Sequence, residues 1–186
     1  MQVEMRGVVE TLQTVPPPRF QPVEICQLLR DAQVRPETLA PYIHFAKGRY
    51  TRNLIFRNEL FELLALCWAP GTRSPIHNHS NQLCWLSIQS GALQLKNFHS
   101  LDGPGPGERI RLVESGGVER AEVGCLDLQQ GDDGIHQVLN PFEQPAVSLH
   151  VYSRPYDACI AYDLEKQTAC EQPLRYWSIG GKLVQQ

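Results

Sequence analysis

The sequence predicts a single, mainly β domain, built as a closed sandwich or jelly-roll barrel with a small helical cap at its N-terminus. From about residue 48 onward, short apolar stretches of strand length are separated by turn-forming Gly, Pro and Asn residues. About eight such strands in one chain are typical of a closed sandwich or jelly roll. The chain has 186 residues, which suffices for one domain with a full core. The predicted fold class is therefore all-β dominated.

The N-terminal segment, residues 1–46, is expected to form the helical cap. A helix is expected over 22–31, because apolar residues recur there near helical spacing and a proline suits its first turn. A second short helix is expected over 36–41. The remaining residues, 47–186, are expected to form the barrel, with a turn at the glycines of 115–117. Its strands are expected at 50–56, 60–68, 84–89, 92–98, 109–114, 120–128, 146–152 and 158–163.

Composition argues against several classes of function. The net charge is −3 and no run of Lys or Arg occurs, so nothing favours a nucleic-acid or membrane-surface partner. The apolar runs are shorter than a bilayer span and the N-terminus lacks a signal-peptide core, which predicts a cytoplasmic protein. The six cysteines show no C-x-x-C pair and are expected to be free thiols in a reducing compartment. No exposed apolar stripe demands a partner, so a monomer is expected.

Histidines give the strongest chemical signal in the chain. On an extended segment, residues two apart point to the same face, so His77 and His79 can bind one ion together. His136 from a neighbouring strand would complete a set of three and leave open coordination positions, as a catalytic metal requires. Imidazoles suit iron, zinc, copper, nickel or manganese. The alternative is that paired histidines occur here by chance.

A second group of polar residues alternates with apolar ones near the C-terminal half of the barrel. On a strand, Ser148, His150 and Tyr152 share one face. An inward polar row would indicate a site, whereas an outward row would be plain solvent exposure, and the alternation alone fits both. Arg52, on another expected strand, could bind a carboxylate through two parallel hydrogen bonds or form a surface salt bridge.

The spacing of Gly71, His77, His79, Cys84 and Gly91 resembles the first motif of the cupin barrel family. In that motif many cupins place a glutamate ligand where this chain has Cys84. The second cupin motif is matched in its histidine and asparagine but lacks the usual proline and glycine. Three neutral imidazoles without a carboxylate would leave ferrous iron with a local charge near +2. Such a site favours an anionic donor from the substrate, for which a thiolate is the softest biological candidate.

Six ordered blocks between Tyr50 and Tyr162 together resemble the cysteine dioxygenase family, the thiol dioxygenase branch of the cupins. The blocks are residues 50–54, 66–68, 76–79, 84 with 91, 134–136 and 146–153. The resemblance implies a cupin jelly-roll barrel. It also implies an iron-dependent enzyme that adds both atoms of O2 to the sulfur of L-cysteine, giving cysteine sulfinate.

The resemblance also implies roles for individual residues. His77, His79 and His136 would bind Fe(II). Arg52 would hold the carboxylate of the substrate, helped by Tyr50.

Three further residues carry implied roles around a tyrosine hydroxyl. Tyr152, tethered through His150 and Ser148, would present its hydroxyl to bound cysteine and oxygen. Cys84 stands where some family members form a thioether cross-link to that tyrosine. Whether the bond forms in this chain is left open by the sequence.

Two other functions stay open at this point. A 3-mercaptopropionate dioxygenase would use the same iron chemistry on a substrate without the amine, but that branch usually carries glutamine in place of Arg52. A non-catalytic cupin that binds a metal as a sensor is the alternative from another class. No DNA-binding helix pair or basic face supports it.

Overall fold

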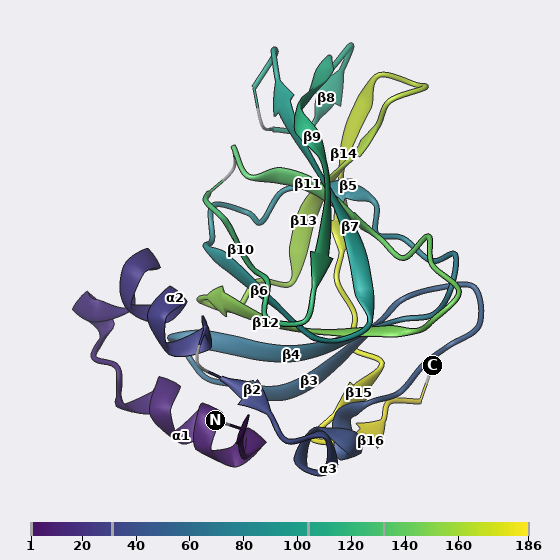
Figure 1. The fold of residues 1–186 in the computed structure, drawn as a ribbon. Coiled ribbons are helices and arrows are strands. Elements are labelled where there is room, and N and C mark those ends of the chain that lie inside the picture. Colours follow the sequence, from purple (N-terminus) through teal and green to yellow (C-terminus); the bar gives the residue numbers. More distant parts are fainter. Residues whose placement is uncertain (1, 31, 104, 132, 186) are drawn as a thin grey trace.

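The computed structural model describes residues 2–30, 32–103, 105–131 and 133–185. Two β-sheets pack against each other, and the helices cover the outer face of one of them (Figure 1). In sheet order, the first sheet contains β10 (Leu126–Gln129), β6 (Cys84–Ser90), β12 (Ala146–Ser153), β4 (Phe61–Trp68), β3 (Thr51–Arg57), β15 (Ser178–Ile179) and β16 (Lys182–Leu183). The second contains β8 (Gly107–Glu108), β14 (Thr168–Pro173), β13 (Ala158–Asp163), β5 (Ile76–His77), β11 (Ile135–Leu139), β7 (Ala92–Ser100) and β9 (Leu112–Glu122).

Helices precede the barrel strands. They are α1 (Met5–Thr14), α2 (Pro22–Arg30) and α3 (Pro36–Leu39), with 3-10 turns at Pro17–Arg19 and Ala40–Tyr42. A short parallel pair, β1 (Gln2–Val3) with β2 (Gln33–Val34), joins the two ends of this region. Helix α2 matches the helix predicted over 22–31, whose last residue, Asp31, lies outside the described residues.

Helix α1 is absent from the sequence-based expectations. It forms because Met5, Val8 and Leu12 recur at helical spacing and are all buried on one face. None of the helices in the described part of the chain is long and apolar enough to span a membrane.

Strand β12 borders two interiors, because its side chains alternate between the two faces of the first sheet. Val147, Leu149 and Val151 pack beneath the helices in one apolar cluster. Ala146 and Tyr152 belong to a second cluster, which combines side chains of both sheets. The even-numbered residues of β12 therefore point into the space between the sheets.

The turn predicted at residues 115–117 is wrong. Strand β9 runs through these residues without a break and takes in parts of both strands expected at 109–114 and 120–128, while the short β10 takes in only the end of the second. The pairing of β7 with β9 shifts register there, and Gly116 takes a left-handed φ of 77°. A glycine in this conformation is typical of a β-bulge, which accommodates extra residues within a continuing strand.

Gly91, between β6 and β7, is required by its surroundings. Its φ is 72°, and a Cβ atom built there would lie 2.5 Å from the carbonyl oxygen of Pro145. We expect Gly91→Ala to lower the free energy of unfolding by about 2–4 kcal/mol, from backbone strain and overpacking together. Urea unfolding measures this change. The control is Gly7→Ala in α1, where a Cβ meets nothing within 4 Å and alanine should stabilise by about 0.5–1 kcal/mol.

Candidate metal and substrate site

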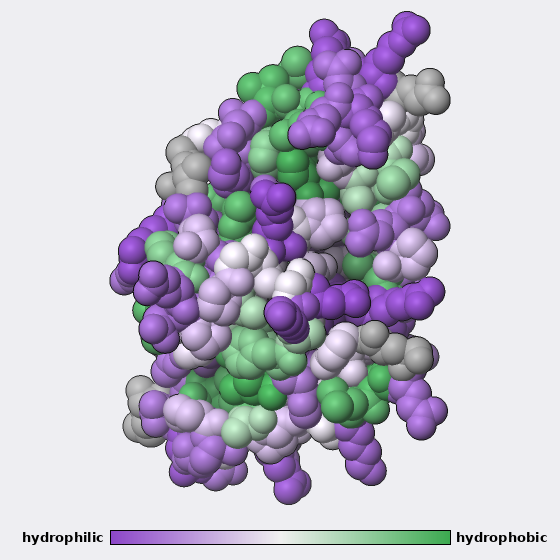
Figure 2. Space-filling model, turned by 90° about the vertical axis from the view of Figure 1, so that its right-hand side faces the viewer, coloured by the Kyte–Doolittle hydropathy of each residue, from purple (hydrophilic) through white to green (hydrophobic). Residues whose placement is uncertain are grey.

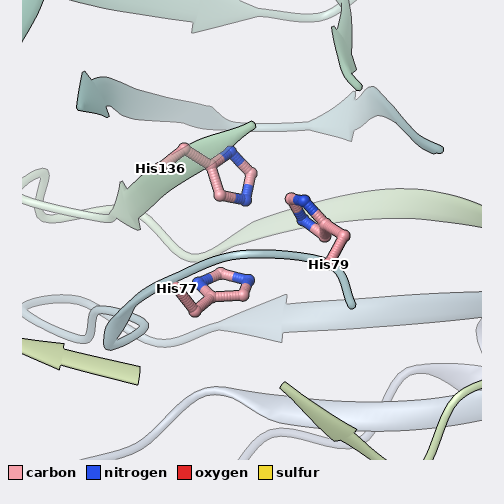
Figure 3. A group of neighbouring side chains, drawn as sticks. All are labelled: His77, His79 and His136. Carbon is pink, nitrogen blue, oxygen red and sulfur yellow. The ribbon is translucent and has the colours of Figure 1, made fainter. Parts of the chain in front are cut away.

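Three histidine rings meet on the inner face of the second sheet. His77 on β5 lies directly opposite His136 on the antiparallel strand β11, and His79 follows two residues after His77. The ring centroids are 4.8–5.1 Å apart, and one ligand nitrogen from each ring lies within 4.8 Å of the others. Figure 3 shows the three rings facing a shared space. The structure thus brings together the three residues that the sequence predicts as ligands.

The unsatisfied nitrogens of these rings fit a bound metal. Both ring nitrogens of His79 and Nδ1 of His136 are buried without a hydrogen-bond partner among the described residues. Leaving such an atom unpaired costs about 1–3 kcal/mol, and coordination would recover this cost for the one nitrogen of a ring that binds the ion. Nδ1 of His77 lies 3.0 Å from the carbonyl oxygen of Pro75, so Nδ1 carries the proton and leaves Nε2 free to bind.

Burial keeps all three imidazoles neutral at physiological pH. It lowers the pKa of His77 to about 4 and lowers the pKa of His79 and His136 well below the usual range. A neutral imidazole has the lone pair that a metal needs. The site is therefore ready to bind a cation without first losing protons.

The polar row on β12 faces inward, which resolves the two possibilities that the alternation left open. Ser148, His150 and Tyr152 are all buried. Nε1 of Trp68 donates to Oγ of Ser148 at 2.9 Å, and Oγ of Ser148 lies 2.9 Å from Nε2 of His150. Nδ1 of His150 then lies 3.2 Å from the hydroxyl of Tyr152, whose ring is 5.9 Å from that of His79. A chain of hydrogen bonds thus fixes the tyrosine beside the histidines.

Arg52 reaches the same space from β3. It is only 7% exposed, which excludes a surface salt bridge, and its guanidinium carbon lies 5.6 Å from the ring centroid of Tyr152. Arg52 and Tyr50 line a cleft of about 710 Å³, and Tyr50 stacks on Trp68 at 4.7 Å. Figure 2 shows the side of the molecule on which the C-terminus lies, where hydrophilic side chains surround patches of hydrophobic ones.

Comparison with known proteins assigns the chain to a family. The family model described as "Cysteine dioxygenase type I" matches residues 18–165. Cysteine dioxygenase type 1 of Homo sapiens is 38% identical over 144 residues, which cover 76% of this chain and 70% of that protein. The chain belongs to the cysteine dioxygenase family. The Danio rerio protein of the same name is 32% identical over 165 residues, which cover 86% of this chain and 78% of that protein.

The fold class agrees with this family. The two packed sheets confirm the predicted cupin jelly-roll barrel with short N-terminal helices. A solved structure from Klebsiella pneumoniae, an uncharacterized protein with a double-stranded β-helix domain, aligns at 15% identity. That alignment covers 62% of this chain and 81% of the other, with a TM-score of 0.49.

Cys84 lies beside the tyrosine that the family resemblance pairs with it. It is directly opposite Tyr152 where β6 and β12 pair, and its Sγ is 3.8 Å from Nδ1 of His150. Burial raises the pKa of the Cys84 thiol, so it is protonated at physiological pH. Burial also raises the pKa of Tyr152, which keeps its hydroxyl protonated.

A buried carboxylate near Arg52 is missing from the sequence-based expectations. Glu62 on β4 is fully buried, and its Oε1 lies 3.4 Å from Nη2 of Arg52. The hydroxyl of Tyr176 donates to Oε2 of Glu62 at 2.5 Å. Burial raises the pKa of Glu62, and the nearby charge of Arg52 opposes that rise. The signal in the sequence that could have revealed this carboxylate is a single acidic residue inside an otherwise apolar strand.

The buried histidines predict how the metal-free protein responds to acid. Burial lowers the pKa of His150 to about 3, and the pKa values of the three clustered histidines are lowered as well. The unfolded chain, with histidine pKa values near 6.5, therefore binds more protons than the folded chain below that pH. We expect the contribution of these neutral histidines to the free energy of unfolding to be fully present above pH 6.5. As the pH is lowered below 6.5, the free energy of unfolding should fall by about 1.4 kcal/mol per pH unit for each histidine that stays neutral in the folded chain.

Urea unfolding at several pH values, with a chelator present, measures this dependence. His150→Gln should reduce the slope, whereas the same substitution at the exposed His99 should not. A stability that does not change between pH 7 and pH 5 would contradict the expectation.

Proposed function

We propose that this chain is an iron-dependent thiol dioxygenase that adds both atoms of O2 to the sulfur of L-cysteine, giving cysteine sulfinate. The observation that carries the proposal is the meeting of three neutral imidazoles, of which His79 and His136 are buried and His77 is half-buried, beside an inward-facing tyrosine and a buried arginine. Membership of the cysteine dioxygenase family supports an oxidoreductase whose substrates are a small thiol and O2.

Fe(II) is the metal that we assign to His77, His79 and His136. Three uncharged nitrogen donors suit a ferrous ion, and the described cluster contains no carboxylate. The ion would supply the electrons for oxygen activation and a coordination position for the thiolate. Because the protein ligands carry no charge, an anionic sulfur donor from the substrate would compensate the charge of a bound ferrous ion.

Arg52 is assigned to the substrate carboxylate. Its Nε is buried without a hydrogen-bond partner among the described residues, so this donor is available to a ligand. A guanidinium can bind a carboxylate through parallel, charge-assisted hydrogen bonds, which fix orientation as well as position. Tyr50 lines the same cleft and would assist this contact.

The hydroxyl of Tyr152 is assigned to the reacting atoms. The oxygen of Ser148 accepts the N–H of Trp68, so its own hydrogen is free to go to Nε2 of His150. His150 then carries its proton on Nδ1 and donates it to the oxygen of Tyr152. This leaves the hydrogen of the tyrosine hydroxyl to point toward substrate, where it can stabilise charge that develops on oxygen.

A thioether between Cys84 and Tyr152 is part of the proposal. The two residues are direct cross-strand partners inside the barrel. Forming the S–C bond breaks the S–H bond of the thiol and one C–H bond of the ring, and the two protons and two electrons released would pass to dioxygen, giving hydrogen peroxide. After turnover with iron and cysteine, we expect part of the protein to be lighter by one hydrogen molecule in intact-mass spectra. Cys84→Ser should lack this species.

A cytoplasmic location is also proposed. All six cysteines are free, which suits a reducing compartment.

Oxygen uptake after anaerobic reconstitution with iron tests the proposed function. We expect uptake that depends on cysteine, with cysteine sulfinate as the product in mass spectrometry. Faster turnover of 3-mercaptopropionate than of cysteine would contradict the substrate assignment. Metal binding without any thiol-dependent oxygen uptake would contradict the enzyme assignment and favour a sensor.

A further inference from the structure

We propose that Glu62 is a positioning residue that holds the guanidinium of Arg52 in the orientation in which it receives the substrate carboxylate. This inference rests on the proposed function and extends it. It concerns a residue that neither the histidine cluster nor the hydrogen-bond chain of β12 includes.

The position of Glu62 on β4 places it between the site and a second arginine. It lies directly opposite Arg57 on β3 and directly opposite Tyr152 on β12, so it occupies the inner face of the first sheet. Its side chain has no exposed area. A carboxylate in that environment is retained only with charged or hydrogen-bonding partners, because desolvation is costly.

Glu62 has such partners on both of its oxygens. Oε1 faces Nη2 of Arg52 at 3.4 Å, while Oε2 accepts from the hydroxyl of Tyr176 at 2.5 Å. Nη1 of Arg57 lies 4.0 Å from Oε2 and donates to the same tyrosine hydroxyl at 2.7 Å. The carboxylate is thus held from the side away from Arg52, and it cannot rotate without losing these contacts.

This contact determines which part of the guanidinium is free. Nη2 of Arg52 is engaged by Glu62, whereas Nε has no partner among the described residues and is buried. A guanidinium is planar and rigid, so fixing one nitrogen fixes the direction of the other donors. Glu62 therefore directs the remaining donors of Arg52 into the space that Tyr152 and the histidines border.

The C-terminal part of the chain fixes the same arginine a second time. The backbone N–H of Trp177 donates to the carbonyl oxygen of Arg52 at 2.7 Å. The preceding residue, Tyr176, holds Glu62. Two adjacent residues therefore fix both the backbone of Arg52 and the acid that orients its side chain.

The role predicts a defect confined to substrates that carry a carboxylate. Glu62→Gln keeps the shape but removes the charge that faces Arg52. We expect the KM for cysteine to rise about tenfold or more, as for loss of a charge-assisted contact, with a smaller change in kcat. Cysteamine, which lacks the carboxylate, should be unaffected, whether measured as a substrate or as a competitive inhibitor. Glu10→Gln, which makes the same change in an exposed ion pair with Arg6, is the matched control.

A second variant and a second readout keep the test decisive. Tyr176→Phe retains the carboxylate but removes its shortest hydrogen bond, and should give an intermediate rise in KM. In the metal-free protein, hindered rotation of the Arg52 guanidinium should give separate NMR signals for its two terminal nitrogens. Arg52→Lys assigns these signals, and in Glu62→Gln they should merge.

The outcomes separate this inference from the proposed function. If the unaltered protein consumes no oxygen with cysteine, the proposed function fails, while the NMR signals still test the positioning role. Unchanged signals together with an unchanged KM for cysteine in Glu62→Gln would overturn the inference and leave the function intact. An equal loss with cysteine and cysteamine would overturn it as well, because a general structural defect does not distinguish the two.

Discussion

His136→Ala is expected to abolish both metal retention and thiol-dependent oxygen uptake. His136 is 1% exposed, lies opposite His77 across β5 and β11, and supplies one of three ligand atoms. Loss of a residue that only orients a metal ligand costs about 10–100-fold in affinity or activity, so loss of a direct ligand should exceed about 100-fold. Elemental analysis after dialysis and an oxygen electrode measure the two losses.

The exposed His99 on β7 provides the control for this experiment. His99→Ala should retain full metal content and activity, because its side chain lies at the surface of the second sheet. Both variants should fold, since Nδ1 of His136 has no hydrogen-bond partner among the described residues that alanine would remove. Normal iron content and turnover in His136→Ala would show that the ligand set is wrong.

Arg52→Lys is expected to impair capture of cysteine more than any other single change outside the ligands. Lysine keeps a positive charge opposite the buried Glu62, so the fold should tolerate it, but it lacks the planar pair of donors. Truncating one partner of a buried, charged hydrogen-bonded pair costs about 2–5 kcal/mol, or roughly thirtyfold or more in affinity. We therefore expect a large rise in the KM for cysteine and little change for cysteamine.

Arg49→Lys makes the same substitution at an exposed position that lines the same cleft. It should leave the kinetic constants for cysteine nearly unchanged. If both variants behaved alike, the carboxylate would be bound by the general positive charge of the cleft rather than by Arg52.

Two strands that carry substrate-site residues, β12 and β3, could be predicted because their local pattern is strong, whereas β5 and β11, which carry His77 and His136, were not among the expected strands. Strand β12 was expected over 146–152 and is found at Ala146–Ser153, and the expected β3 is displaced by one residue. Which face of β12 points inward could not be predicted. That choice depends on the helices packing against Val147, Leu149 and Val151, and those contacts link residues far apart in the sequence.

Two further features were missed for different physical reasons. The glycines at 116 and 117 predict a turn in isolation, but pairing of β9 with β7 converts them into a bulge. Glu62 is visible in the sequence as one acid within the apolar stretch 60–68. The role of Glu62 depends on the hydrogen bond from Tyr176, which is 114 residues away along the chain. No local pattern contains that contact.

Because β12 has one polar face and one apolar face, it also constrains the register in which the chain folds. If the register between this strand and β4 shifted by one residue, Leu149 would occupy the place of His150. The imidazole would then lie in the apolar cluster under the helices. Such a register-shifted form loses apolar burial and leaves a polar ring buried without hydrogen-bond partners, so it is strongly disfavoured. Burial of Val147, Leu149 and Val151 beneath the helices thereby fixes the register that places His150 and Tyr152 in the site, although the apolar side chains lie on the opposite face of the sheet.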